Sequence, residues 1–248
     1  MPILTYLESW GRYCQFAGRS FVAALQSIRR PGELGRQLHR ILLGALPLGV
    51  VAGLAMGVVV WIHLHGVVSA EYRRKVPEYL ALAVVLEFAP LGAGLVVAGR
   101  SGASLGAELG SMKLTEQLDA LEVLGLSPMK QLVGPRVLAC MITLPLLTVF
   151  IAYVAIGSSF LAEMLGGNLY WTQYQNDVLR GLEQAKAVPA TLKTVVFGFL
   201  VAVTGCYQGM QAQGGTEGVG LAATRGVVVS TFLVLISNVV LVKLIQLI

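Results

Sequence analysis

The amino-acid sequence predicts an all-α membrane protein with five transmembrane helices and one N-terminal helix at the membrane interface. Of its 248 residues, 56% are hydrophobic and 12% are charged, whereas soluble domains carry about 25% charged residues. The mean hydropathy is +0.74, and long runs contain no charged residue. Lipid offers no partner to a free backbone group, so such runs must be helical if they cross a bilayer. A water-soluble globule, a disordered chain and a coiled coil are excluded.

The first 30 residues are predicted to form an amphipathic helix in the headgroup layer. Apolar residues recur at steps of three or four, while Arg12 and Arg19 lie off this stripe. The segment Arg29-Arg30-Pro31-Gly32 then ends the helix. The alternative is a helix that packs on a soluble partner. The stripe consists of Leu4, Leu7, Trp10, Cys14, Ala17, Phe21, Leu25 and Ile28.

Five charge-poor segments follow, and each is long enough to span a hydrocarbon core of about 30 Å, which needs about 20 residues. Glu87 is the one charged residue that interrupts the second segment, and Pro189 begins the fourth, where proline suits the first turn of a helix. The third is long enough to tilt. The predicted spans are residues 41–62, 79–99, 137–162, 189–210 and 222–246.

The distribution of basic residues predicts a cytoplasmic N-terminus and an outer C-terminus, since cytoplasmic loops carry an excess of Lys and Arg. We therefore interpret the net charge of +5 as a signal of orientation, with no nucleic acid as a partner. The outer segments contain five basic residues: Arg73, Arg74, Lys75, Arg180 and Lys186. The cytoplasmic segments contain eleven: Arg12, Arg19, Arg29, Arg30, Arg36, Arg40, Arg100, Lys113, Lys130, Arg136 and Arg225.

The cytoplasmic segment between spans two and three is predicted to contain an amphipathic helix over about residues 105–125. Its leucines repeat at helical spacing beside three acidic residues, and Gly125 with Ser127-Pro128 ends it. Two interpretations stay open, a docking surface for a cytoplasmic protein and a solvated helix tucked against the bundle. The leucines are Leu114, Leu118, Leu121 and Leu124, and the acidic residues are Glu116, Asp119 and Glu122.

Glu87 is the main candidate functional residue, because a charge inside a span costs several kcal/mol unless it is paired, hydrated or protonated. Lys193 begins the fourth span at a comparable or shallower depth, so the two side chains could meet. The alternative is an ion pair that only fixes helix rotation. Asn238 in the fifth span is either an interhelical hydrogen-bonding residue or a residue that lines a cavity.

Gly49, Gly53 and Gly57 form a small-residue face on the first span, which allows a close approach of another helix. Spacing alone favours neither of two interpretations. The glycines pack within the chain, or they form a dimer seam or a groove for an acyl chain.

The sequence contains no machinery for chemistry of its own. It has no G-x-x-x-x-G-K-[ST] phosphate loop, no HExxH and no GxSxG, so neither ATP binding by that route nor hydrolysis in the membrane is expected. Cys14, Cys140 and Cys206 lack metal-binding spacing and are interpreted as packing residues. His63 and His65, at the outer end of the first span, are interpreted as interfacial polar residues. No metal site is predicted.

Several motifs resemble those of the MlaE (YrbE) permease family, the membrane subunits of ABC transporters that work on lipids with MCE proteins. The resemblance extends from about residue 40 to the end, so the whole chain, residues 1–248, is expected to form one permease domain. Pro135-Arg136 contributes to it. The other motifs are residues 98–103 (AGRSGA), 108–128 (ELGSMKLTEQLDALEVLGLSP), 144–148 (LPLLT) and 218–225 (GVGLAATR).

The resemblance implies a homodimer in the bacterial inner membrane, between a cytoplasmic ABC ATPase dimer and a periplasmic hexamer of MCE domains. ATP and Mg would be bound by the ATPase, with no cofactor in this chain, and a STAS-domain protein is a further expected partner. The cytoplasmic helix would dock on the ATPase through Lys113, Glu116, Asp119, Leu121 and Glu122. The implied function is ATP-driven phospholipid transport that supports outer-membrane lipid homeostasis. The alternative is a non-transporting scaffold that anchors the ATPase and the MCE ring.

The family's lipid cavity lies at the dimer interface, and the resemblance places Glu87, Lys193 and Asn238 in it, with Gly49, Gly53 and Gly57 as further candidates. Glu87 matches an acidic position of the motif Arg-Glu-Leu-Gly-Pro, but this sequence reads Leu86-Glu87-Phe88-Ala89-Pro90, so the neighbouring Arg is lost. Asn238 lies where some relatives carry Asp. The headgroup of the lipid is therefore expected to meet fewer charges here.

Overall fold

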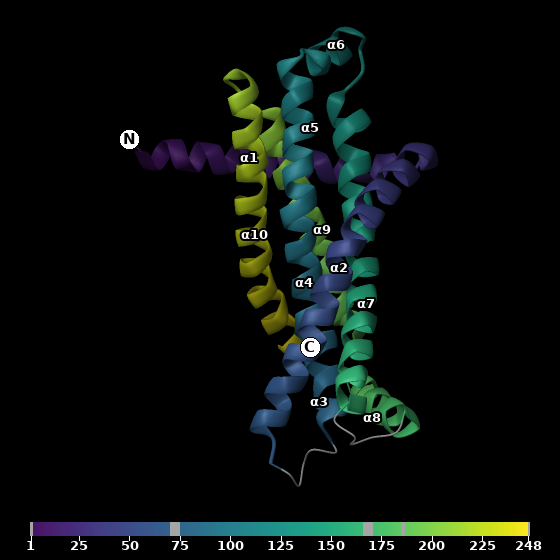
Figure 1. Ribbon diagram of the computed structural model, residues 1–248. Coiled ribbons are helices and arrows are strands. Elements are labelled where there is room, and N and C mark those ends of the chain that lie inside the picture. Colours follow the sequence, from purple (N-terminus) through teal and green to yellow (C-terminus); the bar gives the residue numbers. More distant parts are fainter. Residues whose placement is uncertain (1, 70–74, 166–170, 185–186, 248) are drawn as a thin grey trace.

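The computed structural model describes residues 2–69, 75–165, 171–184 and 187–247, all organised around long helices (Figure 1). Arg73, Arg74 and Lys186, which enter the predicted charge bias, lie outside the described residues. In chain order the elements are α1 (Pro2–Ser27), α2 (Pro31–Val67), α3 (Val76–Ala83), η2 (Val84–Phe88), α4 (Ala89–Val97), η3 (Ala98–Gly102), α5 (Ala103–Leu114), α6 (Gln117–Val123), η4 (Met129–Val133), α7 (Gly134–Leu165), α8 (Trp171–Gln184), α9 (Ala187–Met210) and α10 (Gly215–Leu247).

Five helices within the described residues are long and apolar enough to cross a membrane, which confirms the predicted number of spans. They are Pro31–Val67, Val76–Leu114, Met129–Leu165, Ala187–Met210 and Gly215–Leu247. Four of them extend beyond both predicted bounds, and Ala187–Met210 begins two residues before its predicted start. The second is a single rod in which α3, α4 and α5 are joined by the π-helical segments η2 and η3.

Helix α1 lies across the bundle, while the five long helices run along it (Figure 1). The face of α1 toward the bundle includes the buried small residues Ser20, Ala23 and Ala24. Part of the predicted apolar stripe points the other way, with Trp10 59% and Leu25 53% exposed. Exposed apolar side chains on a transverse helix are what a helix in the membrane interface requires.

The glycine face of α2 packs against α7 of the same chain. A methyl group at Gly57 would lie 2.0 Å from the carbonyl oxygen of Ala155, and one at Gly53 would lie 3.0 Å from that of Ile151. Gly49 meets the side chain of Leu147. Packing within the chain is therefore the interpretation that the structure favours, and placing these glycines on an open lipid cavity is wrong because α7 occupies the space.

Two glutamates fasten α7 to its neighbours at opposite ends. At the end near α6, Glu108 of α5 accepts hydrogen bonds from Arg40 of α2 at 3.0 Å and from Arg136 of α7 at 2.8 Å. At the end near α8, the buried Glu163 of α7 accepts a hydrogen bond from Trp61 Nε1.

His65 Nε2 lies 3.4 Å from the same Glu163 carboxylate. The prediction that His65 is an interfacial polar residue did not include this contact with Glu163, for which the sequence gives no signal.

The segment predicted as one helix over 105–125 is divided in the structure. Helix α5 continues the second span to Leu114, the chain turns at Glu116 with φ of 57°, and α6 begins at Gln117. A residue with a positive φ ends a helix, because the left-handed backbone conformation cannot continue a right-handed helix. The ion pair between Lys113 and Asp119, at 3.0 Å, joins the two sides of this bend.

Helix α8 was not predicted. It packs on α3 and α7, with Tyr174 1% exposed and its hydroxyl 2.6 Å from that of Ser159. Burial raises the pKa of Tyr174 to about 12, so this hydroxyl stays neutral. Among the cysteines, Cys140 and Cys206 are buried as expected, but Cys14 is exposed.

We expect Gly57→Ala to destabilise the protein by about 1–3 kcal/mol, because the new methyl group meets a backbone carbonyl that cannot rotate away. Gly66→Ala is the control on the same helix, since nothing lies within 4 Å of its new methyl group. Thermal unfolding of both variants in detergent measures the difference. Equal midpoints for the two variants would contradict the assigned contact between α2 and α7.

Candidate functional site

A proline creates the local backbone geometry around Glu87. Pro90 has no N–H group, so the carbonyl of Leu86, four residues earlier, loses its normal helical donor. The helix widens to the π form over Val84–Phe88 at this point, a rare form that is often found at functional sites. The Lys193 ammonium of α9 donates to the Leu86 carbonyl at 2.9 Å. A defect in one helix is thus satisfied by a charged side chain from another.

The same ammonium pairs with Glu87, at 3.1 Å between Lys193 Nζ and Glu87 Oε2. Asn238 of α10 donates from Nδ2 to the same carboxylate oxygen at 3.3 Å. The structure therefore brings three of the candidate residues together, and we call Glu87, Lys193 and Asn238 the charged trio. Its members come from three separate spans.

The members of the charged trio differ in exposure. The Lys193 side chain is 2% exposed, whereas that of Glu87 is 42% exposed. Asn238 Oδ1 is buried and has no hydrogen-bond partner among the described residues. The lysine neutralises the site from within, while the carboxylate faces outward. Such an arrangement can offer a hydrogen-bond acceptor to a ligand without leaving an isolated charge in the membrane.

Two spans, α2 and α10, are poorly covered by the rest of the chain. Only 22% of the most apolar window of α2 and 11% of that of α10 are buried, against 50% in each of the other three spans. Both helices present large apolar side chains outward, including Val51, Leu54, Phe232 and Val239. Contact with lipid or with another protein is required to cover them.

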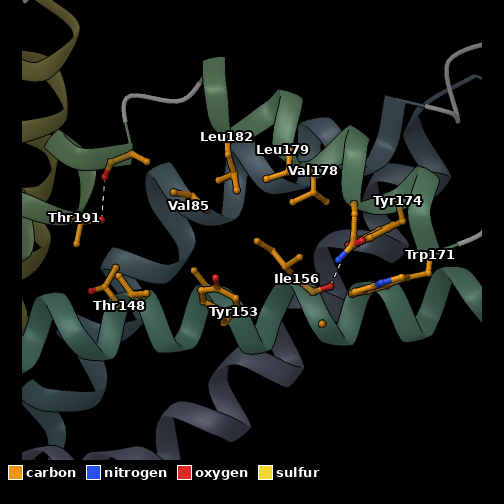
Figure 2. Close-up of a pocket in the computed structure, with 15 residues that line it drawn as sticks. Val85, Thr148, Tyr153, Ile156, Trp171, Tyr174, Val178, Leu179, Leu182 and Thr191 are labelled. Carbon is orange, nitrogen blue, oxygen red and sulfur yellow. Dashed lines mark hydrogen bonds between the residues drawn. The ribbon is translucent and has the colours of Figure 1, made fainter.

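A cavity of about 410 Å³ lies elsewhere, between α7 and α8. Figure 2 shows Val178, Leu179 and Leu182 of α8 facing Tyr153 and Ile156 of α7 across it. None of the trio residues lines this cavity, although Val85 and Thr191 of its lining lie two residues from Glu87 and Lys193. The cavity and the charged trio are thus distinct features.

The tip formed by α6 carries the second group of candidate residues. Glu116, Asp119 and Glu122 are exposed, Leu121 is half-buried, and Lys113 pairs with Asp119. Val123 and Leu124, 87% and 72% exposed, form an apolar edge beside these acids. Sequence reasoning missed Val123 and assigned Leu124 to a continuous helix, because the break at Glu116 rotates α6 away from the phase of α5.

Comparison with known proteins gives one consistent match. A family model described as Permease MlaE matches residues 34–244. A probable ABC transporter permease protein of Rickettsia typhi is 35% identical over 245 residues, which cover 97% of this chain and 93% of the relative. The intermembrane phospholipid transport system permease protein MlaE of Haemophilus influenzae is 33% identical, over 79% of this chain and 72% of the relative. A chloroplastic Arabidopsis thaliana protein, TRIGALACTOSYLDIACYLGLYCEROL 1, is 37% identical over 68% of this chain and 48% of its own length.

We expect Lys193→Met to destabilise the protein by about 2 kcal/mol, because the Leu86 carbonyl loses the ammonium donor and the Glu87 carboxylate loses its cationic partner. Adding Glu87→Gln to Lys193→Met should recover part of this loss, since no unpaired charge then remains. Lys243→Met, at an exposed position on α10, is the control. The assignment fails if thermal unfolding shows equal losses for Lys193→Met and Lys243→Met.

Proposed function

This chain belongs to the MlaE permease family of ABC transporter membrane subunits, and we propose that it moves phospholipid between the inner membrane and a periplasmic MCE protein, driven by ATP. The charged trio carries this proposal: it places an outward-facing carboxylate and a covered ammonium inside a membrane-spanning bundle. The name of the Haemophilus relative, an intermembrane phospholipid transport permease, supports the substrate class. The physiological outcome would be outer-membrane lipid homeostasis.

A second copy of the chain is the proposed cover for α2 and α10. These two spans are the least buried of the five, and Glu87 is bonded to Asn238 of α10. A homodimer through these faces would place two charged trios around a shared apolar space. Acyl chains would occupy the apolar faces, and the polar headgroup would meet Glu87 and Asn238.

The energy is proposed to enter through α6, which would dock on a cytoplasmic ATPase that holds ATP and Mg. Val123 and Leu124 supply an exposed apolar edge, and Glu116 and Glu122 supply charge beside it. Helix continues without a break from Leu114 back to Val76, through Glu87. A displacement of α6 would therefore reach the charged trio along one rod and rearrange the seam of α2 and α10.

The remaining partners are proposed from family membership. An MCE hexamer would receive or deliver lipid at the end of the bundle near α8, and a STAS-domain protein would join the ATPase. A non-transporting scaffold would show no crosslinks from lipid to α2 and α10. Photoreactive phospholipid in the intact complex therefore separates transport through this chain from anchoring alone.

We expect Glu87→Gln to lower lipid transfer about tenfold, because the amide lacks the charge that strengthens hydrogen bonds to a headgroup. Glu217→Gln makes the same change at an exposed position near the start of α10 and should leave transfer unchanged. Transfer of labelled phospholipid between liposomes with the reconstituted complex is the measurement. Full transfer and full lipid occupancy in Glu87→Gln would reduce Glu87 to a structural residue.

Reversal of Glu116, Asp119 and Glu122 to lysine should weaken ATPase binding at least about tenfold, since each reversal turns attraction into repulsion at the proposed interface. Because Asp119 also pairs with Lys113, the variant with only Glu116 and Glu122 reversed separates docking from local folding. Glu33→Lys on α2 is the control. Unchanged co-purification of the ATPase with the triple variant would refute docking through α6.

A further inference from the structure

A cluster of arginines lies at the ends of α2, α5 and α7 near α6, away from the charged trio. Glu108 binds Arg40 through both carboxylate oxygens, at 3.0 and 3.1 Å, and binds Arg136 at 2.8 Å. Arg136 is 2% exposed, and its Nε and Nη1 have no partner among the described residues. One carboxylate thus serves two guanidinium groups, and part of their hydrogen-bonding capacity is unused.

Arg100 adds a third guanidinium beside these groups. Its side chain makes no ion pair or hydrogen bond with any residue that the structure describes. It lies directly against the backbone of α2, where a methyl group at Gly44 would come within 2.3–2.5 Å of the guanidinium atoms. Arg100 belongs to the π-helical segment η3, as Glu87 belongs to η2. Arg100 is exposed, and its guanidinium lies against α2.

A small hollow adjoins these groups. It has a volume of about 50 Å³, and its polar lining consists of Gln37, Arg40, Arg100, Ser101, Ser104 and Glu108. Since about 10–15 Å³ suffices for one water, the hollow can hold a small polar group. Its lining contains two arginines and one carboxylate, and that carboxylate is already shared by Arg40 and Arg136. The hollow is therefore suited to an anion.

The hollow lies at the level of the transverse helix α1. Tyr13 of α1 bonds Thr204 of α9 at 2.8 Å, and the next residue, Gly205, meets Gly102, two residues from Arg100. Arg100 is also ~36 Å along the helix from Val76, slightly more than a hydrocarbon core of about 30 Å. With α1 in the interface, Arg100 is at the depth of the cytoplasmic-leaflet headgroups.

We propose that this hollow binds the phosphate group of an anionic phospholipid from the cytoplasmic leaflet. A guanidinium presents paired N–H donors that match phosphate oxygens, and the hydroxyl groups of Ser101 and Ser104 supply further donors. The excess positive charge favours an anionic lipid over a zwitterionic one. The site is ~20 Å along the helix from Glu87, so it is separate from the proposed transport site. The proposal depends on the orientation of the protein in the membrane and not on the transport function.

Native mass spectrometry of the full-length protein in detergent, titrated with phosphatidylglycerol, tests the proposal. Arg100→Gln should bind this lipid about tenfold more weakly than the parent protein, because it loses a charged donor pair. Arg36→Gln is the matched control: Arg36 is also on the cytoplasmic side, but its side chain is 77% exposed and paired with Glu33. Equal affinities of the two variants would overturn the site.

Further variants keep the test decisive if Arg100→Gln does not fold. Arg100→Lys retains the charge but not the planar fork, and Gly44→Ala displaces the guanidinium without removing it. Both should also weaken lipid binding, and normal affinity in both folded variants would overturn the proposal.

Two further measurements separate the source of the phosphate and the role of the site. Inorganic phosphate should not displace the lipid at millimolar concentration. Displacement by phosphate, with no effect of Arg100→Gln on the lipid, would overturn the lipid as ligand and indicate a free anion. Glu87→Gln should retain phosphatidylglycerol at this site, so the test stands even if the transport proposal fails.

Discussion

A carbonyl group in the middle of a bilayer must find its donor within the protein, because the surrounding lipid supplies none. Pro90 deprives the Leu86 carbonyl of its helical donor, and the Lys193 ammonium donates to this carbonyl. An ammonium in this position needs a counter-charge, which Glu87 provides, and the carboxylate in turn orients Asn238. The hydrogen bonds and the ion pair that follow from the missing N–H group of Pro90 therefore join the second, fourth and fifth spans.

The close contact between α2 and α7 has an equally wide effect. The glycine face brings the two backbones together, and Glu108 and Glu163 fasten the pair at opposite ends. Because α2 packs this face against α7, much of the rest of its surface is left uncovered. The part of the surface that calls for a partner is thus determined by packing inside the chain.

The sequence was sufficient for the five spans, since charge-free runs of this length have one stable form in lipid. The depth of Glu87 and Lys193 also made their contact foreseeable. The side on which Gly49, Gly53 and Gly57 pack was not foreseeable, because spacing describes one helix and not its neighbour. The bend at Glu116 was not predicted, because the residue with the left-handed backbone conformation is a glutamate and not the glycine that usually marks one. The contacts of Glu163 and Arg136 join residues far apart in the chain, which periodicity cannot reveal.

The two π-helical segments also determine the angular phase of the long second rod. Each accommodates an extra residue relative to an α-helix, and each residue turns a helix by about 100°. The side chains of α5 are therefore rotated relative to α3 by two such insertions, and Glu108 faces Arg40 and Arg136 only with both in place. The loss of a single residue from η2 or η3 would rotate the part of the rod after it by about 100° relative to the part before it. The number of residues in η2 and η3 therefore determines which way the side chains of α5 face relative to those of α3.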